Sequence, residues 1–274
     1  MKDAAPDRDR DTRPCLTEAV EYASWMDAIR AAEVVQQYKQ FSFTQLGLKA
    51  GDHVLDVGCG TGDDARALAA QVGATGRVVG IDTSERLISE ARERSRGAEL
   101  PVEFHLQDIH FLNAPDATFH ACRADRTFQH LDQPQEALRQ MVRVTRAGGI
   151  VCLCEPDWST VVVDSQDLEW TRAILEFACN HVRHGWIGRQ LRRLLRQAGL
   201  QDVQITPFTL TATDYSQAVK VFGLEYSATE AQKSGIISPE AAASWLSNLD
   251  EDSNAGLFFA AATVFVAAGR KPDA

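Results

Sequence analysis

The sequence lacks the features that mark several large classes of protein. It has no run of about 18 apolar residues, so we expect no transmembrane helix and no membrane partner. The opening dozen residues are dense in charge and contain no apolar core, which predicts no secretion signal and a cytoplasmic location. The net charge is -10 and basic residues form no concentrated block outside one short helix, so the electrostatic footprint of a nucleic-acid-binding protein is missing. These absences favour a small-molecule substrate and no nucleic-acid partner.

Cysteine is too scattered for a disulfide framework or a zinc site. Most of the six cysteines lie in apolar contexts, and a chain of 274 residues needs no disulfide staples. Cys152 and Cys154 could suggest a metal site, but positions i and i+2 of a strand simply share one face. No second pair stands at the usual zinc spacing. We therefore expect reduced, structural thiols and no metal at these positions: Cys15, Cys59, Cys122, Cys152, Cys154 and Cys179.

The most informative stretch is His53-Val-Leu-Asp-Val-Gly-Cys-Gly-Thr-Gly62 and the helical segment 63–72 that follows it. Its aliphatic residues are typical of a strand buried on both faces. Its three glycines permit a tight turn that a ligand can approach closely, with free N–H groups at the start of the next helix. A plain strand-to-helix turn is the competing interpretation, because glycine motifs match by chance as well.

Two further strands make the ligand-binding interpretation stronger. Segment 77–82 is a strand that ends in Asp82, twenty residues after Gly62, a spacing typical of an acid that binds ribose hydroxyls. Segment 102–107 is a third strand, followed by Asp108. Asp56, Asp82 and Asp108 should therefore meet at one edge of a parallel sheet, where ligands bind in doubly wound folds.

These residues resemble the class I S-adenosylmethionine-dependent methyltransferases, in particular the branch with the ubiquinone and menaquinone C-methyltransferases. Asp56-Val-Gly-Cys-Gly-Thr-Gly62 looks like the first motif of that family, Gly80-Ile-Asp-Thr-Ser84 like its second and Gln107-Asp108-Ile109 like its third. The resemblance is close over roughly residues 50 to 155. A nicotinamide-binding fold would prefer glycine at position 63, where this chain has Asp63.

The alternation of strands and helices, together with this resemblance, predicts the fold class. We expect an α/β protein with a Rossmann-like, doubly wound, seven-stranded sheet, its last strand antiparallel, and with helical cap insertions. Residues 1–16 should be a disordered tail, 17–48 a helical segment, and 49–274 the methyltransferase domain with cap insertions around 156–190 and 207–252. The expected strands are 53–57, 77–82, 102–107, 117–124, 149–155, one ending at 205, and 258–269.

The resemblance implies how a bound S-adenosylmethionine, or its product S-adenosylhomocysteine, would be held. The backbone of the glycine turn would lie against the methionine part, Asp82 would accept the ribose hydroxyls, and Asp108 would accept from the adenine amino group. Asp82 and Asp108 could instead be helix caps or surface carboxylates. The full set of implied cofactor residues is Asp56, Gly58, Cys59, Gly60, Gly62, Asp82, Thr83, Leu87, Gln107, Asp108, Ile109, Ala124 and Arg126.

The segment after the fourth strand holds the remaining candidates. Arg126 has a planar fork suited to the methionine carboxylate, but a salt bridge to Asp56 or Asp125 is an equal alternative. His130 could be a general base, because its pKa lies near the working range, or it could pack structurally.

Substrate candidates come from three places in the chain. Asp157 and Trp158 follow the fifth strand, and Trp158 could instead only plug the cap. Tyr22, Met26 and Lys39 lie in the leading segment, which could equally be a packing helix.

The predicted activity is methyl transfer to O, N or C of a small organic molecule, with homodimer formation left open. Two alternatives stay open: a cofactor-binding protein that catalyses a non-methylating step such as a cyclisation, or a non-catalytic binding protein.

Overall fold

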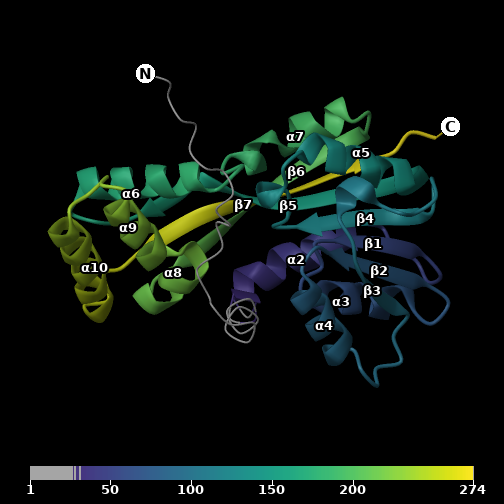
Figure 1. Cartoon of the computed structure of the whole chain (residues 1–274), viewed down its shortest axis with the longest axis horizontal. Helices are drawn as coiled ribbons and strands as arrows, with labels where there is room; N and C mark the ends of the chain where they lie inside the picture. The colour runs from purple at the N-terminus through teal and green to yellow at the C-terminus, as the bar shows by residue number, and fades with distance from the viewer. Residues whose placement is uncertain (1–26, 28, 31, 274) are drawn as a thin grey trace.

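The computed structural model describes residues 27, 29–30 and 32–273. The predicted tail at 1–16 and the substrate candidates Tyr22 and Met26 lie outside the described residues. Within the described chain, a seven-stranded sheet runs through the molecule in the order β3-β2-β1-β4-β5-β7-β6 (Figure 1). Its strands are β1 His53–Val57, β2 Arg77–Asp82, β3 Val102–Leu106, β4 Phe119–Asp125, β5 Thr145–Val163, β6 Gln201–Ala212 and β7 Ala260–Arg270.

The sheet is mixed, and its one reversed strand is β7. Strands β1 to β5 pair in parallel, whereas β7 pairs antiparallel with both β5 and β6. The predicted fold class is therefore confirmed, including the direction of the last strand. Parallel neighbours place the carboxyl ends of β1, β2, β3 and β4 at one edge, as expected for a ligand site.

Helices cover both faces of the parallel part of the sheet. One apolar core joins the sheet to α2, α3 and α4, and the other joins it to α5 and α7. The described helices are α2 Glu33–Gln45, α3 Asp63–Val72, α4 Glu85–Arg94, α5 Pro134–Val144, α6 Leu168–His181, α7 Ile187–Gln197, α8 Tyr215–Phe222, α9 Leu224–Lys233 and α10 Pro239–Asn254, with short 3₁₀ turns η1 Ile109–Phe111 and η2 Phe128–His130. No described helix has the length and apolar character that crossing a membrane requires.

The first part of the fold matches the sequence-based expectation closely. β1, α3 and β2 have the predicted bounds, because the apolar run, the glycine turn and the acidic stop all act locally. Ser84 is the N-cap of α4: its side chain accepts a hydrogen bond from the backbone N–H of Leu87 at 3.3 Å.

Strands β5 and β6 are longer than the sequence predicted. We expected β5 to end at 155 and β6 at 205, but they continue to Val163 and Ala212. Both keep pairing with β7 along this extension, with Val163 and Ala212 each opposite Ala260. The reason is tertiary: an antiparallel partner satisfies backbone groups well beyond the edge where β4 ends. The predicted cap insertion at 156–190 therefore begins as a strand rather than as a helix.

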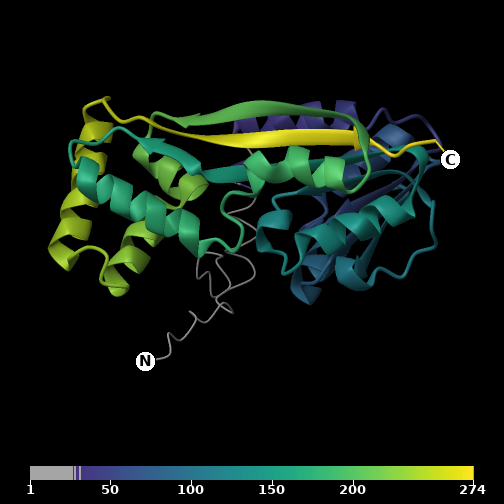
Figure 2. The same cartoon turned by 90° about the horizontal axis from the view of Figure 1, so that it is seen from above.

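Four helices gather on these extended strand ends, and we call α6, α8, α9 and α10 the helical lobe. Figure 2 shows them on one side of the long β6 and β7. Trp245 of α10 is fully buried at the centre, and its indole N–H donates to Thr171 Oγ1 of α6 at 2.8 Å. The lobe and the parallel part of the sheet are thus joined by β5, β6 and β7.

Candidate functional site

The glycine turn after β1 requires glycine for steric reasons. Gly58, Gly60 and Gly62 have φ of 68°, 53° and 78°, in the left-handed region that other residues rarely adopt. A Cβ on Gly58 would lie 2.2 Å from Thr127 Oγ1, and one on Gly62 would lie 2.5 Å from a ring carbon of Phe104. A side chain at either position would therefore clash with its packed neighbours, and we call this turn, with its exposed backbone, the glycine cradle.

Asp82 joins this turn to the next helix. One carboxylate oxygen accepts from the Gly60 N–H at 3.0 Å, and the other accepts from the Ser84 N–H at 2.9 Å. The Asp82 backbone carbonyl also accepts from the Gln107 N–H at 3.0 Å. These bonds bring the ends of β1, β2 and β3 together and leave the carboxylate half-buried at the sheet edge.

Asp108 is the N-cap of the η1 turn. Its Oδ1 accepts from the His110 N–H at 2.9 Å and lies 2.7 Å from His110 Nδ1. Asp108 is thus a cap, one of the alternatives considered for it. Because 41% of its side chain is exposed, a bound ligand can still contact the carboxylate. Nearby, Ile109 and Leu87 are buried and Thr83 is exposed.

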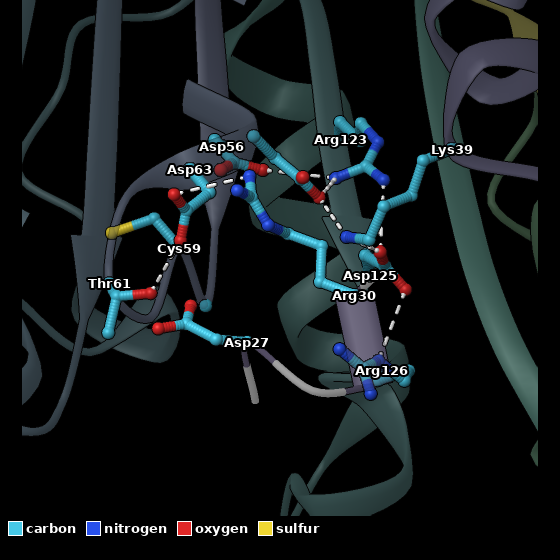
Figure 3. Close-up of a pocket in the computed structure, with 12 residues that line it drawn as sticks. Asp27, Arg30, Lys39, Asp56, Cys59, Thr61, Asp63, Arg123, Asp125 and Arg126 are labelled. Carbon is cyan, nitrogen blue, oxygen red and sulfur yellow. Dashed lines mark hydrogen bonds and ion pairs between the residues drawn. The ribbon is translucent and has the colours of Figure 1, made fainter. Parts of the chain in front are cut away.

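Beneath the glycine turn lies a set of five charged residues that we call the ionic cluster: Lys39, Asp56, Asp64, Arg123 and Asp125. Arg123 is fully buried in β4, and its guanidinium contacts Asp64 at 2.9 Å and Asp125 at 3.1 Å. Lys39 reaches in from α2 and pairs with Asp64 and, at 2.5 Å, with Asp125. Figure 3 shows Lys39 and Arg123 pointing toward the acids from separate elements.

The acids of the cluster respond to burial in opposite ways. Burial opposes ionisation of Asp64 and Asp125, but Lys39 and Arg123 outweigh it and lower the pKa of both carboxyls. Asp56 has weaker compensation, with Arg123 Nη1 3.6 Å away, so burial raises its pKa to about 7. Asp56 Oδ2 has no hydrogen-bond partner among the described residues. A buried oxygen of this kind can accept from a cationic ligand group.

A cavity of about 50 Å³ opens between the glycine turn and the ionic cluster (Figure 3). Asp27 and Arg30 of the leading segment close one side of it, and Arg30 lies 3.2 Å from Asp63. Lys39, a pocket candidate from the sequence, also lines the cavity. The complete lining is Asp27, Arg30, Lys39, Asp56, Gly58, Cys59, Thr61, Asp63, Asp64, Arg123, Asp125 and Arg126.

Residues 126–130, which we call the β4 turn, follow β4 beside the glycine turn, and Arg126 is the member that lines the cavity. Ala124 is buried at the end of β4, and Arg126 adopts a left-handed backbone with φ of 53°. The Arg126 side chain lines the cavity, and its Nε lies 3.7 Å from Asp125 Oδ1. The geometry is therefore compatible with both readings of Arg126, the ligand contact and the salt bridge to Asp125.

Glu155 is a functional candidate that sequence reasoning did not single out. Its carboxylate is fully buried and accepts from the N–H groups of Thr127 at 2.8 Å, Phe128 at 2.6 Å and Gln129 at 3.4 Å. Burial raises the pKa of Glu155 to about 8, against the effect of these donors. The sequence signal that could have identified Glu155 is its position as an acid at the end of the apolar predicted strand 149–155.

Two of the remaining candidates have structural partners. Asp157 is fully buried, and its carboxylate accepts from Arg189 Nη2 at 2.6 Å and from the Arg189 N–H at 3.1 Å. Its oxygens thus hold the start of α7, and a substrate contact of Asp157 stays a prediction. Trp158 donates from its indole N–H to Gln129 Oε1 at 2.6 Å, which fits the structural alternative. His130 is exposed at the end of η2.

Comparison with known proteins gives one family. Residues 48–199 match the Methyltransferase domain family. An uncharacterised 37.1 kDa protein in transposon Tn4556 of Streptomyces fradiae is 38% identical over 245 residues, 89% of this chain and 69% of that protein. Demethylmenaquinone methyltransferase of Lactobacillus johnsonii is 26% identical over 220 residues, 74% of this chain and 90% of the relative.

A solved structure supports the fold. The [4+2]-cyclase SpnF superposes with a TM-score of 0.58 at 21% identity, covering 88% of this chain and 82% of SpnF. At that identity the likeness concerns the fold alone.

Proposed function

The chain belongs to the Methyltransferase domain family and is a methyltransferase, and from this premise we propose that it transfers a methyl group from S-adenosylmethionine to a small organic molecule. The observation that carries the choice of cofactor is the glycine cradle held by Asp82, whose carboxylate accepts from Gly60 and lies at the sheet edge. Oδ2 of buried Asp56, which has no hydrogen-bond partner in the part of the chain that the structure describes, is a second feature that suits the cationic end of this cofactor.

The chemistry of the residues along this edge of the sheet supports a proposed placement for each part of S-adenosylmethionine. We propose that the methionine ammonium lies over the glycine turn near Asp56, with Arg126 at the carboxylate and the main chain of Ala124 beside it. Asp82 would accept the ribose hydroxyls, and Asp108 the adenine amino group. The other proposed contacts are Gly58, Cys59, Gly60, Gly62, Thr83, Leu87, Gln107 and Ile109.

The bound cofactor would supply an electrophilic methyl group on a sulfonium. The chain's own residues then have to orient the acceptor in line and exclude water, which accounts for the scarcity of candidate acid–base groups. His130 is our candidate base for acceptors that must lose a proton, and its exposure at the end of η2 leaves it accessible.

We propose that the acceptor is small and largely apolar and that it binds between the β4 turn and the helical lobe. Half-buried aromatic side chains of the lobe favour an apolar acceptor: Trp170, Phe177 and Tyr215. The L. johnsonii relative is named for a demethylmenaquinone substrate, also a small molecule. A cytoplasmic location and a homodimer remain predictions from the sequence.

The first experiment is a calorimetric titration of the purified chain with S-adenosylhomocysteine, with NAD as the control nucleotide. We expect micromolar binding, about 8 kcal/mol of binding free energy, that is lost in Asp82→Ala. Glu85→Ala is the matched control, because Glu85 is an exposed acid three residues away, in the first turn of α4. Failure of the wild type to bind S-adenosylhomocysteine, or preference for NAD, would refute the cofactor assignment.

Transfer of labelled methyl then separates the activities. Label arriving on an acceptor supports methyl transfer. Cofactor binding with no transfer to any acceptor in a broad screen would favour the non-methylating alternative.

A further inference from the structure

The side chain of Gln129, which belongs to none of the sequence motifs, holds the β4 turn in place. Gln129 is 97% buried, at 3% exposure, and lies between the cavity wall and the connection from α6 to α7. Its side-chain Nε2 donates to the Arg126 carbonyl at 3.3 Å, and its Oε1 accepts from the Trp158 indole at 2.6 Å. Its backbone N–H donates to Glu155 and its carbonyl accepts from the His184 N–H at 3.1 Å. Every polar group of Gln129 is thus engaged.

The backbone at Arg126 needs such support. A non-glycine residue at φ of 53° is in a sparsely populated, strained conformation, and it persists only where the surroundings impose it. Two hydrogen bonds fix the peptide groups on either side: the Arg126 N–H donates to the Cys154 carbonyl at 2.8 Å, and the Arg126 carbonyl accepts from Gln129. The N–H of the same peptide unit, that of Thr127, also donates to Glu155 Oε1 at 2.8 Å, so loss of the Gln129 bond leaves this unit held from one side only and widens the range of backbone angles that Arg126 can adopt.

The turn also contacts the glycine cradle directly. Thr127 Oγ1 donates to the Val57 carbonyl at 3.2 Å and occupies the space where a Cβ of Gly58 would lie. A movement of residues 126–127 would therefore reach the cofactor site from two sides.

We infer that Gln129 is a positioning residue for cofactor binding: its amide fixes the left-handed backbone at Arg126, which directs the Arg126 guanidinium into the cavity, and its bond to Trp158 ties that geometry to the substrate side. The inference rests on the proposed function, since it assigns Arg126 to the cofactor. The inference goes beyond the proposed function because it names Gln129 as the group that sets the conformation of Arg126.

A double-mutant cycle tests the inference. Gln129→Met keeps the length of the side chain and removes both hydrogen bonds, and we expect about tenfold weaker binding of S-adenosylhomocysteine. In an Arg126→Gly background the same change should weaken binding less than twofold, because glycine adopts the left-handed backbone freely and has no guanidinium to direct. Equal losses in both backgrounds, or no loss in either, would overturn the inference.

Two further measurements keep the result clear. Gln140→Met, in α5 and away from the turn, should leave binding unchanged. If the wild type does not bind S-adenosylhomocysteine, the proposed function fails separately. Amide hydrogen exchange without ligand then tests the positioning role of Gln129. The exchange rate of the Thr127–Gln129 amides should rise at least tenfold in Gln129→Met, and an unchanged rate would refute that role.

Discussion

The parallel part of the sheet around the glycine turn and the helical lobe on the long strands bury very different groups. Around the glycine turn, the five charged residues of the ionic cluster line the cavity, and Glu155 is buried nearby. In the helical lobe, the buried residues are almost all apolar, with Trp245, Leu249, Leu224 and Ile174 fully enclosed. Burial of charged groups costs desolvation free energy, so the region around the glycine turn is less favourable for stability than an apolar core would be. The helical lobe has an apolar core of that kind, which is the pattern expected when only the first region is a functional site.

The largest effect should appear in the pH dependence of stability. Asp56 and Glu155 have pKa values raised to about 7 and about 8, so the folded chain holds protons that the unfolded chain releases. The free energy of unfolding should then fall by several kcal/mol as the pH rises from 5 to 8. Below pH 4 the sign reverses, because the lowered pKa values of Asp64 and Asp125 stabilise the fold only while both are ionised.

Urea unfolding at several pH values measures this slope. Asp56→Asn and Glu155→Gln should each flatten it between pH 5 and 8. A slope that survives both substitutions would show that these two acids do not carry the pH dependence.

Removal of the buried cation is the next largest effect. Arg123→Met leaves Asp56, Asp64 and Asp125 close together with Lys39 and the more distant Arg126 as the neighbouring cations, so we expect a loss of about 3–5 kcal/mol in unfolding free energy at pH 7. Arg192→Met, in an exposed position of α7, is the control and should change stability by less than about 0.5 kcal/mol. Equal stability of the two variants would contradict our description of the ionic cluster.

Two left-handed glycines allow a matched test of the two regions. Gly58 and Gly223 have nearly the same φ, 68° and 66°, but a Cβ on Gly58 meets Thr127 while one on Gly223 meets nothing within 4 Å. Gly58→Ala should weaken S-adenosylhomocysteine binding about 100-fold, or about 2.7 kcal/mol. Gly223→Ala should cost about 1 kcal/mol of stability from backbone strain and leave binding unchanged. Similar binding by both variants, measured by calorimetry, would remove the steric argument.

The smallest effect concerns the centre of the lobe. Trp245→Phe keeps an aromatic ring but loses the hydrogen bond to Thr171 and some volume, so we expect a loss of about 1–2 kcal/mol in stability. Binding of S-adenosylhomocysteine should not change, because Trp245 lies outside the cavity lining. A binding defect in this variant would show that the two regions are not energetically separate.

Sequence reasoning was strongest where the signals are local. The apolar run of β1, the three glycines, the acid that ends β2 and the Ser84 cap each depend on neighbours within a few residues, and all four are found in the structure. The ion pair of Asp157 was not foreseen, because it is not local. Its partner Arg189 lies 32 residues away, and no pattern around Asp157 announces that pairing.

What the sequence by itself determined is the cradle and its acids, because strand, turn and cap preferences are short-range and the carboxyl ends of parallel strands must meet at one edge. Tertiary structure alone decided the rest. Lys39 meets Asp125 across 86 positions, Gln129 meets Trp158 across 29, and β5 runs to Val163 because β7 returns beside it. Such contacts depend on which distant elements pack together to satisfy buried charges and backbone groups, and the spacing of residues along the chain does not record that choice.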